Sequence, residues 1–192
     1  IAFVRGLFAD CELRELQLTQ DLKAYLETVW SILIEDEGML GASLTDEQRR
    51  RIMDALGQAG SDYRQNLYLR GVTSEFSSVG PDEIASFMDL AQRYIEHTLR
   101  ANQRPDRMYH AYNTLRLDAD RASVDHLYEM LEGQVAILSS GALSGAESLA
   151  LLRALRGSRM YRADQHSYML YPDRQLPGFM EKNPFSSHEA GR

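Results

Sequence analysis

Cysteine is almost absent from this chain of 192 residues, since Cys11 is the only one. A single cysteine allows no disulfide within the chain and no metal site built on several thiolates. We therefore expect a reducing compartment and a cytoplasmic protein. Lysine is also scarce, because Lys23 and Lys182 are the only two and the other 19 basic residues are arginines. Arginine makes planar contacts with several donors, to carboxylates or aromatic faces, that lysine cannot make.

Long apolar runs and basic stripes are missing as well. No run approaches the roughly 18 apolar residues of a membrane span, and the first residues lack the basic region of a signal peptide. The net charge is −7, and the densest basic run, Arg49-Arg50-Arg51, stands among acidic residues. A nucleic-acid-binding protein usually carries a basic stripe. We therefore expect neither a membrane nor nucleic acid as a partner. Because the chain begins with Ile1 rather than Met, we expect a fragment whose partners are other domains of the parent chain.

Helical periodicity dominates what is present. Hydrophobic residues make up 44% and charged residues 26%, the balance of an ordinary globular protein. Sustained alternation of apolar and polar residues, which is typical of strands, is almost absent. The fold class we predict is all-α: paired antiparallel helices (αα-hairpins) with long irregular connections and an irregular C-terminal segment. We expect one helical domain over 1–185 and a flexible tail over 186–192. The predicted helices cover 11–37, 45–56, 61–70, 81–103, 123–138 and 144–156.

Local signals define several of these ends. In 81–103 apolar residues recur at three- and four-residue steps, and Pro81 suits the first helical position. Thr45 and Ser144 each open a capping box, with Gln or Glu three residues later. Gly57 and Gly60 are expected to close the helix that Thr45 opens. Gly157 is expected to end the last helix in the left-handed conformation.

Two segments, 104–118 and 157–176, carry an unusual mixture of tyrosine, histidine, arginine and short polar residues. Tyrosine combines a stacking face with a polar tip, which suits the apolar faces and hydroxyl edges of sugar rings. The alternative is that these tyrosines pack the connections onto the helix ends. The candidate binding residues are Tyr109, His110, Tyr112, Asn113, Gln165, His166, Tyr168 and Arg174.

Glu132 and Asp164 are the candidate catalytic residues, as acid or base. The region around Glu129 and Glu132 has few purely polar positions, so either carboxylate could be partly buried, and burial raises a carboxyl pKa unless a cation compensates. Gly133 is expected to permit a close approach by another backbone. His126, Glu129 and Glu132 at three-residue steps could alternatively share a helix face and bind a metal. That site needs further ligands which the sequence does not offer, so we expect neither a metal nor a cofactor.

Residues 104–113 and 127–174 resemble regions of large bacterial proteins with the six-hairpin, or α/α toroid, fold. The likeness lies in Arg107-Met108-Tyr109-His110-Ala111-Tyr112-Asn113, in Leu127 to Gln134 and in Asp164-Gln165-His166-Ser167-Tyr168. In that fold, paired helices form a ring whose connections line a carbohydrate pocket. The resemblance therefore implies part of such a ring and carbohydrate handling. It includes no defined catalytic motif, so it implies no catalytic role.

Two functions follow from these observations. The first is a helical interaction or regulatory module of a larger multidomain protein, which predicts an exposed apolar patch. The alternative is part of a carbohydrate-active (glycosidase-like) or carbohydrate-binding region. It predicts that the two polar-aromatic segments meet in one concave pocket.

Overall fold

The computed structural model describes residues 2–10, 14–173 and 175–183. The chain divides into two compact units. Unit 1 comprises Ile1–Pro105 and Tyr112–Leu127, and unit 2 comprises Asp106–Ala111 and Tyr128–Arg192. Within the described ranges, no helix is both long enough and apolar enough to cross a membrane. Cys11, Arg174 and the tail 186–192 lie outside the described residues. The prediction of one domain over 1–185 stays a prediction.

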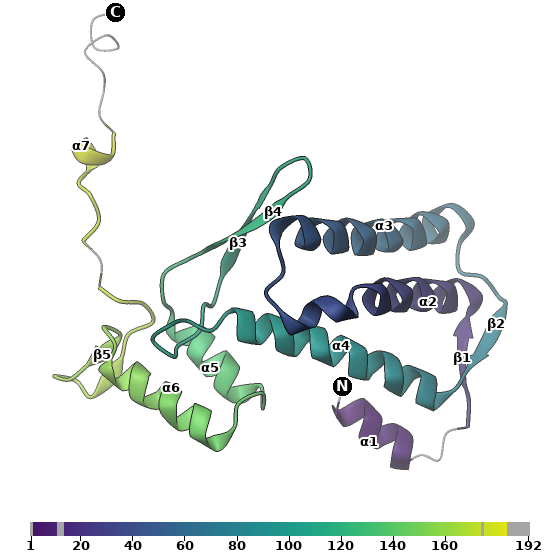
Figure 1. Cartoon of the computed structure of the whole chain (residues 1–192), viewed down its shortest axis with the longest axis horizontal. Coiled ribbons are helices and arrows are strands. Elements are labelled where there is room, and N and C mark those ends of the chain that lie inside the picture. Colours follow the sequence, from purple (N-terminus) through teal and green to yellow (C-terminus); the bar gives the residue numbers. More distant parts are fainter. Residues whose placement is uncertain (1, 11–13, 174, 184–192) are drawn as a thin grey trace, which may run out of the picture. The chain divides into compact units, whose positions relative to one another are not determined.

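Short strands are interspersed among the helices along the chain (Figure 1). Unit 1 contains α1 (Ala2–Asp10), β1 (Leu16–Thr19), α2 (Gln20–Glu35), the 3₁₀ helix η1 (Glu37–Gly41), α3 (Asp46–Arg70), β2 (Phe76–Val79), α4 (Pro81–Ala101), β3 (Asn113–Leu117) and β4 (Ala122–His126). Unit 2 contains α5 (Leu131–Ser139), α6 (Gly145–Gly157), β5 (Tyr161–Arg162), β6 (Ser167–Tyr168) and α7 (Phe179–Lys182).

The prediction of an all-α fold is wrong. The structure is 56% helical, and 14% of it lies in three small antiparallel two-stranded sheets, so it mixes α and β structure. β1 pairs with β2, β3 with β4 and β5 with β6. Each strand has at most five residues, which is too short for alternation to stand out from a helical pattern. The residues 16–19, predicted as helix, form β1 because a partner strand far along the chain supplies the hydrogen bonds.

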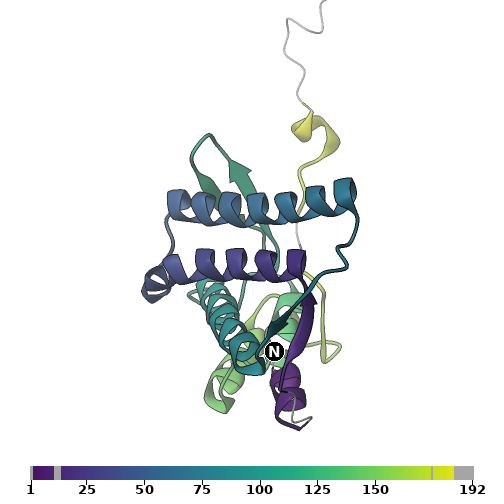
Figure 2. The same ribbon diagram turned by 90° about the vertical axis from the view of Figure 1, so that its right-hand side faces the viewer.

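Helices α2 and α3 of unit 1 run side by side in opposite directions (Figures 1 and 2). The capping box at Thr45 is confirmed: its hydroxyl accepts from the Gln48 N–H at 3.2 Å, and its own N–H donates to Oε1 of Gln48 at 2.8 Å. The predicted end at Gly57 and Gly60 is wrong, because α3 runs through both. A glycine ends a helix when it takes a positive φ. Gly71 does so, with φ 75°, and it directly follows α3.

Helix α4 confirms the prediction for 81–103 closely. It starts with Pro81 at its first turn and ends at Ala101. Its apolar face packs on α2, where Phe87 meets Trp30 edge-on with ring centroids 6.1 Å apart. The Tyr94 hydroxyl donates to the backbone carbonyl of Leu33 at 2.8 Å, since the end of a helix leaves its carbonyls without intrahelical donors. Burial raises the pKa of Tyr94, and the charges of Asp36 and Glu37 raise it further.

The region 122–139 differs most from the prediction of one helix over 123–138. Residues 122–126 form β4, and α5 begins only at Leu131. Asn113 pairs with His126 and Leu117 with Ala122 across the hairpin. The apolar residues here follow helical steps in the sequence. The neighbouring strand decides the structure instead, because it satisfies the backbone groups that a helix would have satisfied locally.

Unit 2 builds its core on α5 and α6. The buried side chains are Met108, Tyr109, Met130, Gln134, Ile137, Leu151, Leu155 and Met160. The capping box at Ser144 is confirmed, with its hydroxyl accepting from Glu147 N–H at 3.3 Å and its N–H donating to the Glu147 carboxylate at 2.8 Å. The predicted left-handed terminator at Gly157 is wrong, since Gly157 is the last residue of α6 and has no positive φ.

Candidate functional site

Tyr109 lies in the core of unit 2, held by a buried glutamine. Gln134 on α5 is fully buried, and its side-chain amide forms a pair of hydrogen bonds with the backbone of Tyr109. Oε1 accepts from the Tyr109 N–H at 2.9 Å, and Nε2 donates to the Tyr109 carbonyl at 2.8 Å. Nε2 also donates to the Met130 carbonyl at 3.0 Å. The Gln134 amide therefore pairs with the backbone N–H and C=O of an irregular segment, as a neighbouring strand would. Tyr109 itself has only 6% of its surface exposed, so its side chain packs in the core of unit 2.

A close approach between α5 and the segment after Tyr109 fixes the same contact. A Cβ on Gly133 would lie 2.7 Å from the Cβ and 3.0 Å from the Cα of Ala111. The expectation that Gly133 admits another backbone is therefore confirmed. His110 lies between these two contacts, half-buried, with its Nδ1 in the interior.

Tyr112 and Asn113 belong to unit 1, unlike Tyr109 and His110. Asn113 connects two side chains: its Nδ2 donates to Oδ1 of Asn102 at 2.7 Å, and its Oδ1 lies 2.8 Å from Nδ1 of His126. This row of side chains joins the end of α4 to the base of the β3–β4 hairpin. Asn113 thus has an evident structural role, while the Tyr112 side chain is 54% exposed.

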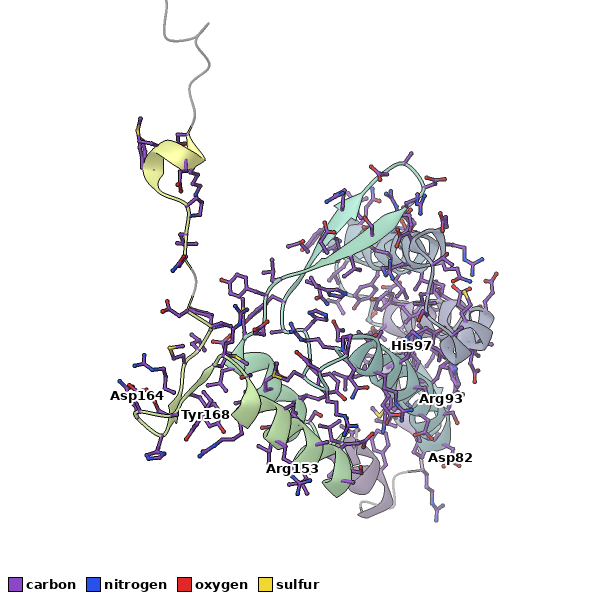
Figure 3. The ribbon with its side chains drawn as sticks, turned by 60° about the vertical axis from the view of Figure 1, so that its left-hand side comes forward. Asp82, Arg93, His97, Arg153, Asp164 and Tyr168 are labelled. Atoms are coloured by element: carbon purple, nitrogen blue, oxygen red, sulfur yellow. The ribbon has the colours of Figure 1, made fainter. Side chains whose placement is uncertain are left out.

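The β5–β6 hairpin of unit 2 gathers the predicted residues of the second segment. Asp164 lies at its end, and Tyr168 lies closer to α6 (Figure 3). Arg162 donates to Asp164 through Nε at 2.9 Å and Nη2 at 2.8 Å. These hydrogen bonds hold the pKa of the Asp164 carboxyl below its usual value and raise that of Arg162. Asp164 therefore stays ionised at neutral pH, which suits a base and not a general acid.

An aromatic cluster occupies the base of this hairpin. The rings of Tyr161 and Tyr168 lie 5.2 Å apart at 55°, and the guanidinium of Arg156 lies 3.8 Å from the centre of the Tyr161 ring. The Tyr161 hydroxyl is 3.2 Å from Nδ1 of His166. Tyr161 thus contacts Arg156 through the face of its ring and His166 through its hydroxyl. Tyr168, with 37% of its surface exposed, keeps part of its ring open to solvent.

The carboxylates at the start of α5 differ in their surroundings. Glu132 is exposed in the first turn, where the helix dipole favours a negative charge. The Glu129 side chain is 13% exposed, and Oε1 accepts from Nη2 of Arg159 at 3.3 Å. Partial burial is thus confirmed for Glu129. Helical spacing of His126 with the two glutamates is wrong, because His126 lies in β4. Over the described ranges, no group of three or more His, Cys, Asp or Glu side chains could hold a metal ion.

The predicted site residues thus fall into three groups. Asp164, Gln165, His166 and Tyr168 share one hairpin of unit 2. Tyr109, His110 and Glu132 lie on or against α5. Tyr112 and Asn113 belong to unit 1, and Arg174 is outside the described residues. Their roles in binding or catalysis stay predictions.

Sequence reasoning missed a groove between α2 and α3. It is a cavity of about 160 Å³ lined in part by Asp21, Tyr25, Asp62 and Tyr63. The two tyrosine rings stack at 4.9 Å and 17°. Reading 45–70 as a single helix would have placed Asp62, Tyr63 and Asn66 on one side of α3, which is the side that lines this cavity.

It also missed an apolar surface at the C-terminal end of α3. Tyr68, Leu69, Val72 and Phe76 are 80%, 75%, 72% and 61% exposed. We call these four residues the α3-end patch. A sequence signal was present: the apolar residues 67–69 come at the very end of the helix, next to Gly71, where little structure can cover them.

The chain matches no model of a known protein family, and a search among curated proteins finds no match either.

Proposed function

We propose that this chain is an interaction module of a larger protein, and that it binds its partner through the α3-end patch. The observation that carries this proposal is the exposure of four large apolar side chains within nine residues. Single exposed apolar residues are ordinary, whereas contiguous ones mark interaction surfaces. The partner we expect is another domain of the parent chain. We expect the interaction to take place in the cytoplasm, because a chain with one cysteine forms no internal disulfide.

The alignment of α2 with α3 leaves the C-terminal end of α3 beyond the start of α2. α3 has 25 residues and α2 has 16, so α3 is about 37 Å long and α2 about 24 Å. The stacking of Tyr25 on Tyr63 sets their alignment, which places the start of α2 opposite residue 68. Residues 69–70 at the end of α3 therefore extend beyond the start of α2. At its other end, α3 is covered by the β3–β4 hairpin, since Arg49 donates to the Ala122 carbonyl at 2.6 Å.

The patch is also held in a defined shape, as a docking surface requires. Gly71 N–H donates to the Leu67 carbonyl at 2.9 Å and closes the helix. Glu75 N–H donates to the Thr73 hydroxyl at 3.1 Å, and the Glu75 carbonyl accepts from Gln20 N–H at 3.0 Å. The segment that carries Val72 and Phe76 is thus anchored at both ends, and an ordered surface loses less entropy on binding than a loose one.

A photo-crosslinking amino acid at position 69, introduced in the cells that make the parent protein, tests the proposal. Position 58 is the matched control, because Gln58 is exposed on the same helix about three turns earlier. We expect a defined adduct from position 69 and none from position 58. Mass spectrometry of the adduct separates a domain of the parent chain from another protein. Equal labelling from both positions would refute the patch as the docking surface.

A second candidate is carbohydrate binding by the β5–β6 hairpin, favoured by one observation: Gln165, His166 and Tyr168 are all exposed on it. An open aromatic face beside amide and imidazole groups fits a sugar ring. Titration of labelled chain with oligosaccharides, followed by NMR, should shift hairpin resonances in the wild type and not in Tyr168→Ala. Unchanged spectra at millimolar sugar would refute it.

A further inference from the structure

The β3–β4 hairpin has one strand whose outer edge is open. The hydrogen bonds that flank its ladder join Asp118 N–H to the carbonyl of Arg121 at 3.0 Å and Leu127 N–H to the carbonyl of Tyr112 at 3.2 Å. In an antiparallel pair, hydrogen-bonded and non-bonded positions alternate. The even-numbered residues of β3 therefore bond to β4. The odd-numbered residues direct their N–H and C=O groups the other way.

These outward groups belong to Asn113, Leu115 and Leu117. All five residues of β3 are exposed, and none of the described residues forms a backbone hydrogen bond to this outer edge. The outer edge of β4 differs, because the Ala122 carbonyl there accepts from Arg49 on α3 at 2.6 Å. β3 thus lies on the side of the hairpin away from α3 (Figure 1). Its outward N–H and C=O groups face solvent, and an extended backbone segment could pair with them as a further strand.

The apolar face of the hairpin is covered on β4 and open on β3. Leu115 pairs with Val124 and Leu117 with Ala122, so these four side chains lie on one face. Ala122 is fully buried, whereas Leu115 is 54% and Leu117 53% exposed. A strand added to β3 would extend this face and shield the two leucines. An isolated two-stranded hairpin is marginally stable in water, so such an addition also stabilises the sheet.

We propose that β3 pairs with β3 of a second copy of this chain, antiparallel and centred on Leu115. This register joins Asn113 to Leu117 of the second copy, and Leu115 to the same residue there. All three pairs are odd with odd, so the alternation is satisfied and about six backbone hydrogen bonds form. The result is a four-stranded sheet with two-fold symmetry, in which the same surface of each copy serves the other.

The side chains agree with this register. On the polar face, Thr114 lies opposite Arg116 of the second copy, and each Arg116 keeps its ion pair with Asp125 at 2.8 Å. Moving the centre to Arg116 would place two guanidinium groups opposite each other, which is unfavourable. The ladder excludes that centre in any case, since the backbone groups of Arg116 bond to β4. Leu115 meets its counterpart on the apolar face. The strand is therefore complementary to itself.

This dimer does not rest on the proposed docking function, because β3 and the α3-end patch are separate surfaces. The contact is small, and interfaces below about 1,200 Å² are weak. We therefore expect a dissociation constant on the order of 10⁻⁵–10⁻⁴ M. Sedimentation velocity from about 5 to 500 μM should show the wild type passing from monomer to dimer. Leu69→Ser, in the α3-end patch, should form the dimer over the same range of concentration as the wild type. A wild type that stays monomeric throughout overturns the proposal.

Leu115→Pro tests the ladder itself. The Leu115 N–H points outward, so proline removes a bond to the second copy and none to β4, and edge strands tolerate proline at such positions. We expect no dimer from Leu115→Pro and a normal dimer from Leu115→Val, which keeps the N–H. Circular dichroism checks that both fold. A dimer that survives Leu115→Pro in folded protein overturns the proposal.

Opposite charges at the dyad give a test that does not depend on proline. Leu115→Lys and Leu115→Asp should each weaken self-association at least tenfold, because like charges would face each other. Mixed together, the two variants should form a heterodimer, as opposite charges meet. Both are tolerated in the monomer, since the position is half exposed. Failure of the mixture to associate more tightly than either variant alone contradicts the register centred on Leu115.

Discussion

Replacing Gly133 with alanine would place a methyl group against the facing backbone in unit 2. The new Cβ would lie 2.7 Å from the Cβ and 3.0 Å from the Cα of Ala111. Carbon atoms in contact prefer about 3.5–4.0 Å, so α5 and the facing segment must move apart by several tenths of an ångström. The Gln134 amide holds that segment by its hydrogen bonds to Tyr109, 2.9 and 2.8 Å long. The movement therefore strains those bonds as well.

The expected loss follows from two opposing terms. Glycine to alanine inside a helix usually gains up to about 1 kcal/mol, and less in the first turn, where Gly133 lies. Forcing an extra carbon into a packed contact costs about 1–3 kcal/mol. We expect the second term to win, with unit 2 losing about 1–2 kcal/mol. In a domain of roughly 70 residues this lowers the melting temperature by about 4–8 °C for each kcal/mol.

Gly57→Ala is the matched control. Gly57 lies inside α3, and a Cβ there would have nothing within 4 Å. Alanine at that position should raise the stability of unit 1 by about 0.5–1 kcal/mol. Trp30, the only tryptophan, lies on α2 in unit 1, so its fluorescence follows unit 1 alone. Amide hydrogen exchange measured by peptide follows both units.

We therefore expect faster exchange in α5 and α6 of Gly133→Ala and slower exchange in α3 of Gly57→Ala. Adding Ala111→Gly to Gly133→Ala should recover part of the loss, because it removes the nearer of the two contacts. If Gly133→Ala stabilises the protein as much as Gly57→Ala does, the backbone of α5 does not approach Ala111 closely enough to exclude a methyl group.

Three further predictions concern single contacts. Gln134→Ala leaves the buried N–H and C=O of Tyr109 without their partner, and urea unfolding should show a loss of about 2–4 kcal/mol. Arg51→Gln removes the cation that pairs with Asp36, a side chain 6% exposed, and should cost about 1–3 kcal/mol in the same assay, since Arg51 itself is 60% exposed. Tyr94→Phe removes a hydrogen bond worth about 1 kcal/mol at pH 7. Burial raises the pKa of Tyr94 in the folded protein above its ordinary value of 10.0. The stability of the wild type should therefore fall as the pH rises from 10.0 through the folded pKa, and that of Tyr94→Phe should fall less.

Each of these has its own control. Gln134→Met keeps the length of the side chain and removes its hydrogen bonds, so a variant as stable as the wild type would contradict the pairing with the Tyr109 backbone. Asp36→Asn added to Arg51→Gln should recover most of the loss, and a purely additive double variant would exclude the ion pair. For Tyr94, identical alkaline unfolding curves of wild type and variant would show that the hydroxyl is not buried as described.

Local signals predicted the helices that have them. The capping boxes at Thr45 and Ser144 were readable because all their partners lie within four residues, and the stripe over 81–103 repeats for several turns. Helix ends that depend on backbone conformation were not readable. Gly57, Gly60 and Gly71 look alike in sequence, and only Gly71 takes a positive φ. The tertiary environment decides which glycine does so.

The strands and the site depend on partners distant in the sequence. Residues 16–19 become a strand only because 76–79 lie beside them, and 122–126 because of 113–117. Tyrosines such as Tyr109 and Tyr168 look equivalent in sequence, yet one is buried and the other is open to solvent. Gln134 resembled an ordinary polar position of a helix. Its role follows from an irregular backbone segment 25 residues away, which no local pattern announces.

The pairing of β1 with β2 also has a consequence for the order in which we expect unit 1 to fold. Leu16 meets Val79 and Thr19 meets Phe76, so the whole α2–α3 excursion is a loop closed by a ladder of four residues. Closing a disordered loop of that length costs about 3–4 kcal/mol in chain entropy, more than so short a ladder returns. Once α2 and α3 have packed against each other, the start of α2 and the end of α3 are neighbours, and the strands that flank them are already close. We therefore expect the β1–β2 ladder to form late, after the pair of helices α2 and α3 is complete.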